Sequence, residues 1–387
     1  MFEMIKLDDI YDKNLNFLIG SGASHGMFPT LALKIKGSDG NPQTLETLAT
    51  LFRQSNDNRL TPLFMHYYMS CIRPAQIFRL EDAEENTAKK TVIANYEIFL
   101  GTVLSTLQRR KPLHKTCNIF TTNYDGCIPL VADSILQRGS IDFVLNDGAR
   151  GFSRRYLQAR NFNTYLCQTG VFERHISSIP QINLIYLHGS VYWTKDGTNI
   201  IVDHSLSQAV DFISEDMKQK LKPFSECLMN NTATIEDLQA IVIDAYEDIA
   251  FWDSYNQLPI VNPTKWKFHE TVFEEHYYQM LRMLSYELEK PNAILITFGF
   301  SFADEHILSL VKRSLSNPSA QIFVCCFDHA EENRLSEEFK THRNVKCITL
   351  KDEFLDFTNF NKIIFTPSPP DTVLTGAEAV PEAGIAK

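Results

Sequence analysis

The chain has 387 residues, of which 44% are apolar and 22% charged, so it can bury a substantial core and is not largely disordered. Its 37 basic and 47 acidic side chains give a net charge of -10 with neutral histidine, which argues against nonspecific nucleic-acid binding because that field repels a phosphate backbone. No window reaches the roughly 18 to 20 apolar residues of a membrane span, and acids interrupt what would be the apolar core of a signal peptide in residues 1–13. We therefore expect a cytoplasmic protein without membrane association.

The eight cysteines are scattered, and none forms a C-x-x-C pair. Neither a disulfide framework nor a cysteine zinc site has the spacing it requires. The sequence therefore predicts no metal site.

Six short apolar runs, rich in β-branched and aromatic residues, predict strands. Continuous rather than alternating hydrophobicity is typical of strands buried on both faces, as in a parallel sheet. Helical spacing between these runs predicts an α/β fold, a Rossmann-like sheet with crossover helices. The predicted strands span residues 16–19, 118–121, 184–187, 294–298, 322–327 and 347–350, and the predicted helices span 92–107, 206–221, 235–249, 271–288 and 305–315.

Two intervals between strands are longer than simple crossovers, which need about a dozen residues or slightly more. They predict a helical insertion module within one enlarged domain. The Rossmann-like domain then comprises residues 1–30, 115–205 and 290–365, with mostly helical insertions at 31–114 and 206–289. Residues 366–387, which are rich in proline and poor in large apolar residues, predict a disordered tail.

The first predicted strand runs into the loop Gly20-Ser21-Gly22-Ala23-Ser24. Glycines here allow a tight turn and let backbone amides approach a phosphate. The G-x-G-x-x-G fingerprint is incomplete, because His25 occupies the place of the last glycine. The alternative is a plain strand-to-helix turn with Ser24 as the helix cap.

Polar residues follow the second and third predicted strands, in Thr121-Thr122-Asn123-Tyr124-Asp125 and in Leu187-His188-Gly189-Ser190. In an open α/β sheet the ligand lies beyond the carboxyl ends of the strands. An amide, a carboxylate and an imidazole are therefore expected to converge beside the glycine loop. Alternatively, Asn123 and Asp125 cap the next helix and His188 bonds loop backbone.

The fourth motif follows the strand predicted at 294–298 and contains Gly299, Ser301 and Asp304 before a predicted helix. A hydroxyl and an acid in this place can cap the helix. They can equally hold a ribose.

These four motifs, in this order, resemble the sirtuin-type NAD-binding fold over roughly residues 12–30, 115–205 and 290–350. Two departures speak against a protein deacylase: the four-cysteine zinc ribbon is missing, and Phe28-Pro29-Thr30 stands where sirtuins have P-D-F-R. The pattern looks more like the bacterial sirtuin-like branch of anti-phage defence, whose members hydrolyse NAD and often work with a HerA-type hexameric ATPase. The matching residues are Gly20, Gly22, Ser24, Thr121, Asn123, Asp125, His188, Gly189, Gly299 and Ser301.

The resemblance implies an NAD glycohydrolase that releases nicotinamide and ADP-ribose, with NAD as substrate and no metal. Asn123 would orient the ribose and the attacking water, and His188 would act as general base. Asp125 would contact the nicotinamide amide or the ribose, and adenine would lie near Phe327 or Asp328. The implied NAD contacts are Gly20, Ser21, Gly22, Ala23, Ser24, Thr122, Asp125, Gly299, Ser301 and Asp328.

Two other functions stay open at this stage: a noncatalytic scaffold that senses NAD or ADP-ribose, and an NAD-dependent protein deacylase. The family resemblance also implies a homo-oligomer. Residues 148–172 contain four arginines among aromatic residues and no acid. This basic stretch could bind nucleic acid or an acidic partner, or be a solvated face or an oligomer interface.

Overall fold

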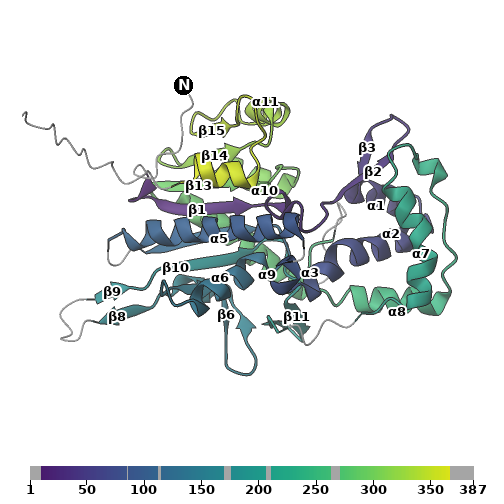
Figure 1. Ribbon diagram of the computed structural model, residues 1–387, viewed down its shortest axis with the longest axis horizontal. Coiled ribbons are helices and arrows are strands. Elements are labelled where there is room, and N and C mark those ends of the chain that lie inside the picture. The colour runs from purple at the N-terminus through teal and green to yellow at the C-terminus, as the bar shows by residue number, and fades with distance from the viewer. Residues whose placement is uncertain are drawn as a thin grey trace, which may run out of the picture.

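A seven-stranded parallel sheet forms the centre of the protein (Figure 1). The computed structural model describes residues 10–84, 86–111, 115–169, 176–205, 211–262 and 271–366, with backbone only at 271–274. The predicted mixed α/β fold with a Rossmann-like parallel sheet is confirmed. In spatial order the strands are β15 (Val345–Ile348), β14 (Gln321–Cys325), β13 (Ala293–Phe298), β1 (Asn14–Ile19), β4 (Thr116–Thr121), β10 (Gln181–Tyr186) and β5 (Val144–Asn146).

Chain order runs outward from β1 in both directions, through β4 to β10 on one side and through β13 and β14 to β15 on the other. This doubly wound order reverses between β1 and β13, and such a switch point is where open α/β sheets bind ligands. Strand β5 was not predicted, because it is three residues long and only half-buried. The predicted strand 322–327 ends at Cys325, and the one at 347–350 lies two residues earlier.

A ladder of four asparagine amides, two buried and two half-buried, fixes the register of four neighbouring strands. Asn118 donates to Asn16, Asn183 donates to Asn118, and Asn146 donates to Asn183, at 2.8, 2.8 and 3.0 Å between nitrogen and oxygen. A slip of one residue would turn these side chains to the other face and leave buried amides unpaired. The ladder therefore helps to bring the carboxyl ends of β1, β4 and β10 to one level.

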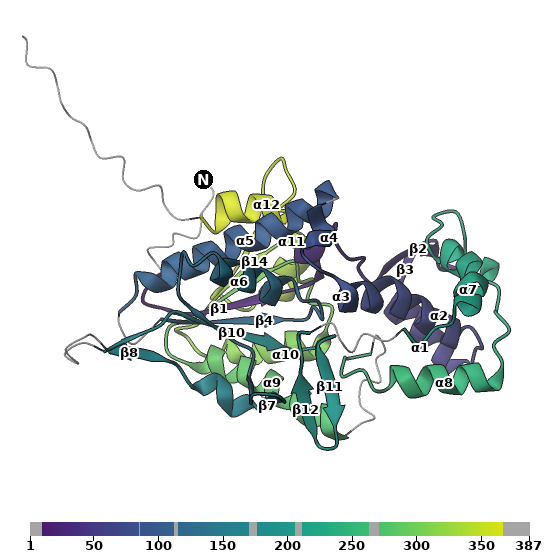
Figure 2. The same ribbon diagram turned by 60° about the horizontal axis from the view of Figure 1, so that its bottom comes forward.

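Helices cover both faces of the sheet, as Figure 2 shows. The long helix α5 (Thr87–Gln108), α6 (Cys127–Gln137) and the short α12 (Phe357–Asn359) lie on one face, and α9 (Thr271–Glu289) and α10 (Glu305–Ser314) on the other. Helix α11 (His329–Glu338) packs against β15. Apolar side chains from these helices and the strands form one continuous core.

A second apolar cluster forms a helical unit beside the sheet, at the right in Figure 1. Both predicted insertions contribute to it, so residues 31–114 and 206–289 build one shared unit. The same two ranges also supply α5 and α9, which pack in the core of the sheet. The elements of the helical unit are β2 (Ala32–Lys36), β3 (Pro42–Thr44), α1 (Leu45–Gln54), α2 (Leu60–Tyr67), α7 (Glu215–Leu228) and α8 (Ala245–Tyr255).

The predicted helix at 235–249 is wrong. A short 3-10 turn spans Ile235–Asp237, and α8 begins only at Ala245, where Asp244 accepts hydrogen bonds from two amides of the first turn. The residues between, 238–244, include the β-branched run 241–243, whose side chains lose rotamer freedom in a helix. Helix α7 likewise begins later than predicted, at Glu215 behind the cap Ser214, and residues 206–210 lie outside the described part.

Smaller elements complete the fold. A four-stranded antiparallel sheet consists of β11 (Trp193–Asp196), β12 (Asn199–Val202), β7 (Tyr156–Leu157) and β6 (Ala149–Arg150), and a separate hairpin pairs β8 (Cys167–Thr169) with β9 (Ile176–Ser178). Two short helices, α3 (Arg73–Ile77) and α4 (Glu81–Glu84), precede α5. Among the described residues no helix combines the length and the apolar character needed to cross a bilayer. The predicted tail at 366–387 lies, beyond Thr366, outside the residues that the structure describes.

Buried His66 makes the stability of the helical unit depend on pH. Its Nδ1 lies 2.9 Å from the Ser225 hydroxyl, so it joins α2 to α7, and burial lowers the pKa of His66 from 6.5 to about 4. As the pH falls from 6.5 toward 4, the unfolded chain binds a proton that the folded chain excludes. We therefore expect this residue to reduce the free energy of unfolding by up to about 3 kcal/mol over that range.

His66→Gln keeps a hydrogen-bonding side chain but cannot titrate, so the variant should lose less stability than the wild type between pH 7 and pH 4.5. Urea unfolding at both pH values measures the difference. Equal losses in the two proteins would contradict this role of His66.

Candidate active site

The loops after β1 and β13 meet at the switch point, and glycines make their contact possible. The amides of Gly20 and Gly22 donate to the carbonyls of Phe298 and Gly299, both at 3.0 Å. A Cβ added at Gly20 would lie 2.3 Å from the Gly299 oxygen, and Gly299 itself has φ +63°. The glycines therefore let two loop backbones touch, a role that the sequence alone did not predict.

The glycine loop forms a four-residue 3-10 turn, Ser21–Ser24, which ends at His25 in an extended conformation. No helix follows directly. The alternative prediction, that Ser24 caps a following helix, is therefore wrong, and its hydroxyl has other partners.

A cavity of about 430 Å³ opens at the carboxyl edge of the sheet and receives residues from all four motifs. This volume falls in the range of small-molecule sites, roughly 300 to 1,000 Å³. The helical unit closes one side with Thr44, Glu46 and Cys71. The motif residues that line the cavity are Ser21, Ser24, Thr122, Asn123, Tyr124, Asp125, His188, Gly299, Ser301 and Asp304.

Four residues with predicted NAD contacts do not line this cavity: Gly20, Gly22, Ala23 and Asp328. The first three shape the loop behind it. Asp328 caps α11 by accepting a hydrogen bond from the Glu331 amide at 2.8 Å. Its neighbour Phe327 is half-exposed and stacks on Phe354 at 4.7 Å between ring centroids.

Ser24 is the hub of a buried hydrogen-bond network. Its hydroxyl donates to Asp125 Oδ2 at 2.8 Å and accepts from Asn123 Nδ2 at 3.2 Å. The hydroxyl of Tyr96 on α5 lies 2.9 Å away, and because the Ser24 proton points to Asp125, Tyr96 donates in this pair. A serine hydroxyl has one donor and two acceptor positions, so the capacity of Ser24 is fully used.

Asp125 serves two purposes at once. Its Oδ1 accepts from the Cys127 amide at 3.0 Å at the start of α6, although the cap residue of that helix is Gly126, while Oδ2 holds Ser24. Burial raises the pKa of Asp125 despite these hydrogen bonds. Both carboxylate oxygens already have protein partners, so the carboxylate is well placed to fix Ser24 and the start of α6.

Asn123 carries an unsatisfied acceptor. The residue is 8% exposed and lines the cavity, and its Nδ2 is held by Ser24. Its Oδ1 is buried and has no hydrogen-bond partner among the described residues. Leaving such an atom unpaired costs about 1–3 kcal/mol, so a ligand hydroxyl or a water is expected to occupy this position.

His188 is oriented by Asp304. Its Nε2 lies 3.1 Å from Asp304 Oδ2, with 15% of the histidine side chain and 6% of the aspartate side chain exposed. Because a carboxylate only accepts, Nε2 carries the proton and Nδ1 is left as the basic nitrogen. The other oxygen of Asp304 caps α10 by accepting from the amides of His306 and Ile307. Asp304 is thus held in place by α10. It has the predicted capping role and, in addition, orients His188, which the sequence did not reveal.

The helical unit is hydrogen-bonded to the loops that follow β4 and β10. Tyr67 of α2 donates to the hydroxyl of Tyr124 at 2.7 Å, and Tyr124 stands between Asn123 and Asp125. The segment after α8 donates from the Val261 amide to the His188 carbonyl at 2.8 Å. No sequence pattern marked Tyr67 or Tyr96, since each meets its partner only through the fold.

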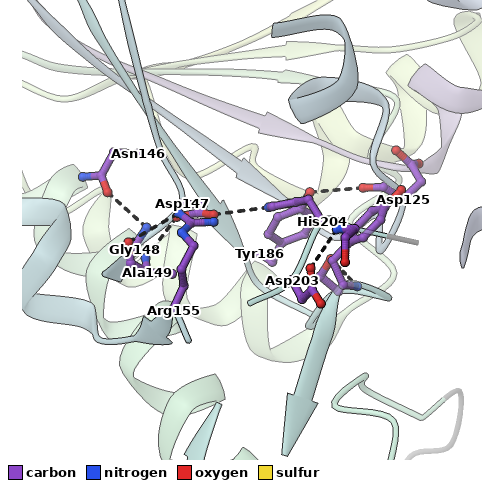
Figure 3. Close-up of polar contacts among 12 residues, drawn as sticks. Asp125, Asn146, Asp147, Gly148, Ala149, Arg155, Tyr186, Asp203 and His204 are labelled. Atoms are coloured by element: carbon purple, nitrogen blue, oxygen red, sulfur yellow. Dashed lines mark hydrogen bonds and ion pairs between the residues drawn. The ribbon is translucent and has the colours of Figure 1, made fainter. Parts of the chain in front are cut away.

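A second histidine–aspartate pair lies outside the cavity lining, in the polar cluster of Figure 3. Asp147 accepts from His204 Nε2 at 3.2 Å and from Arg155 at 2.8 Å. Burial alone would raise the pKa of Asp147, but the hydrogen bond from His204 and the charge of Arg155 hold it below its usual range. Arg155, one of the arginines in the basic stretch, is therefore an internal structural residue.

No protein-family model matches the sequence, and no curated protein matches it either. Within the described ranges, no cluster of three or more histidine, cysteine, aspartate or glutamate side chains is suited to hold a metal ion. The function of the site must therefore be inferred from its own residues.

Removing the Ser24 hydroxyl should lower the stability of the protein. Ser24→Ala leaves Tyr96, Asn123 and Asp125 each without one partner, and we expect a loss of about 1–3 kcal/mol in the free energy of unfolding. Ser21→Ala is the matched control for stability, because Ser21 is exposed in the same turn. Urea unfolding compares the two variants, and equal stabilities would contradict the hub role of Ser24.

Proposed function

We propose that the protein is an NAD glycohydrolase that breaks the bond between nicotinamide and ribose. One observation carries this proposal. A single cavity at the switch point of the sheet is lined both by Asn123, whose buried Oδ1 has no partner among the described residues, and by His188, whose imidazole is oriented by Asp304. Doubly wound sheets bind nucleotides at this place. The resemblance of the four motifs to sirtuin-type proteins supplies the substrate class.

The residues of the cavity fit a dinucleotide. Asn123 Oδ1 can accept a hydrogen bond from a ribose hydroxyl, which would satisfy the buried oxygen. Ser21 and Ser301 add hydroxyl groups to the lining, which can donate hydrogen bonds to a pyrophosphate or a ribose.

In the proposed reaction, water replaces nicotinamide at the ribose C1′. The C1′–nitrogen bond breaks with its electron pair going to nicotinamide, the water oxygen forms the new bond to C1′, and His188 Nδ1 takes the water proton. Glycosyl transfer of this kind passes through an oxocarbenium-like state. Asp304 stabilises the imidazolium that forms, because its carboxylate lies 3.1 Å from Nε2. Asn123, held by Ser24, orients the ribose and the water.

By the same resemblance, we propose that this activity depletes NAD in infected bacterial cells, in an oligomer that works with a HerA-type ATPase. The test measures NAD in cells that express the wild type or His188→Ala, with and without phage. We expect NAD to fall upon infection only with the wild type. Equal NAD levels in both strains across infecting phages would refute the role in defence.

Two purified-protein experiments separate the alternatives. Saturable NAD binding without nicotinamide release, even with partners present, would favour a sensing scaffold. Consumption of NAD only after addition of an acylated peptide would favour a deacylase.

A further inference from the structure

The basic stretch carries a fully exposed aromatic side chain near its start. Strands β6 and β7 form a hairpin, and Phe152 in the turn between them has a relative exposure of 105%, as high as in an extended chain. Arg150, Arg154 and Arg160 are exposed around it. We call residues 149–160 the arginine hairpin. A fully exposed phenylalanine flanked by cations is typical of a docking element, because aromatic and arginine side chains dominate interface energies.

The arginines of this hairpin are too few to follow a nucleic-acid backbone. Arg155 is tied internally to Asp147 at 2.8 Å, and Arg154 lies 3.7 Å from Asp196. Arg150 donates to Thr164, and Arg160 donates to Gln158 at 2.8 Å. Proteins that bind phosphate backbones strongly use about six or more cationic contacts. The hairpin therefore better fits a protein surface that offers apolar contact and a few acids.

Helix α8 presents such a surface on its outer side. Tyr246 and Ile249 of α8 and Val242 in the segment before it have exposed fractions of 82%, 60% and 90%, while Phe251 and Tyr255 of α8 are buried in the helical unit. Tyr246 and Ile249 are three positions apart and so share one side of the helix. We call these three exposed residues the α8 face.

The charges of the two surfaces are complementary. Residues 229–258, which contain the α8 face, include six acids and no lysine, arginine or histidine, whereas residues 148–172 include four arginines and no acid. Asp248 of α8 is engaged with Thr61 at 2.7 Å, but Glu236 and Asp253 are exposed. Opposite charges at the rim of an apolar contact favour association and specificity.

We propose that the arginine hairpin of one chain docks on the α8 face of a second copy. Figure 1 shows the hairpin hanging below the central sheet at β6 and α8 lying along the separate helical unit, so the two surfaces of one chain do not meet. A contact between two different surfaces is heterologous, and repeated copies of it close into a ring or extend as a filament. Phe152 inserts among Val242, Tyr246 and Ile249, and the arginines meet the acids around them.

Light scattering on the full chain after size-exclusion chromatography tests this contact. We expect the wild type at tens of micromolar to exceed twice the chain mass of 44.3 kDa, and Phe152→Ser and Tyr246→Ser each to run as monomers. Both side chains are exposed, so neither variant should unfold, and circular dichroism verifies this. Tyr286→Ser is the matched control, because Tyr286 is 64% exposed on α9 and should leave the assembly intact.

Mixing the two monomeric variants identifies a heterologous contact. The Phe152→Ser chain keeps its α8 face and the Tyr246→Ser chain keeps its hairpin, so the mixture should form a one-to-one dimer and stop there. A monomeric wild type, an assembled Phe152→Ser variant or a mixture that stays monomeric would each overturn the proposal. The proposal would also fail if a monomeric wild type retards a DNA or RNA oligonucleotide and Phe152→Ser does not. The hairpin would then be a nucleic-acid-binding element.

Discussion

Replacing His188 with alanine is expected to lower the rate of NAD hydrolysis by about 10²- to 10⁴-fold, the usual contribution of a positioned general base. The His188 imidazole lines the cavity and is held by a 3.1 Å hydrogen bond to Asp304. Alanine supplies no proton acceptor in its place. Steady-state release of nicotinamide measures the loss in kcat. A change in KM alone would instead mean that His188 only binds the substrate.

The matched control is His204→Ala. His204 is also paired with an aspartate, Asp147 at 3.2 Å, but it does not line the cavity (Figure 3). We expect this variant to keep the rate of the wild type. If both histidine variants lose activity equally, the loss reflects general damage to the fold and the assignment of His188 fails.

Replacing Gly299 with alanine is expected to destabilise the protein by about 2–4 kcal/mol. A side chain at φ +63° costs about 1–2 kcal/mol by itself, and the added Cβ would lie 2.6 Å from the Ala23 amide nitrogen, which forces the two loops apart. Because these loops frame the cavity, activity should fall as well. Urea unfolding measures the change in the free energy of unfolding.

Gly101→Ala is expected to have the opposite effect on the free energy of unfolding. Gly101 lies inside α5 and has open space around the added Cβ, so alanine should stabilise the helix by about 0.5–1 kcal/mol. If Gly299→Ala is as stable as Gly101→Ala, the close contact between the loops after β1 and β13 does not hold the site together.

The sheet could be predicted from sequence because strands buried on both faces leave a direct pattern of short, wholly apolar runs. The meeting of Asn123, Asp125 and His188 at one edge followed from the parallel order, since carboxyl ends of parallel strands share an edge. The helix at 235–249 could not be predicted correctly, because its apolar spacing competes with the β-branched residues before Asp244.

Local sequence patterns could not predict which residues of the site contact one another. Asp304 and His188 are 116 positions apart, and Tyr96 and Ser24 are 72 apart, so only the folded sheet brings each pair together. Gly20 and Gly22 were attributed to phosphate approach, but the structure shows that they and Gly299 pack two loops against each other. The shared helical unit, built from two distant insertions, likewise has no signature in either segment alone.

The most direct test of the proposed function incubates the purified full chain with NAD and quantifies nicotinamide and ADP-ribose by mass spectrometry, for the wild type and for Asn123→Ala. We predict equal molar amounts of both products from the wild type. With Asn123→Ala, we predict a rate at least about 10²-fold lower, because an electrostatic group placed for the transition state contributes about that much. Bound but intact NAD with the wild type even when its partners are present, or equal product formation by both proteins, would contradict the proposal.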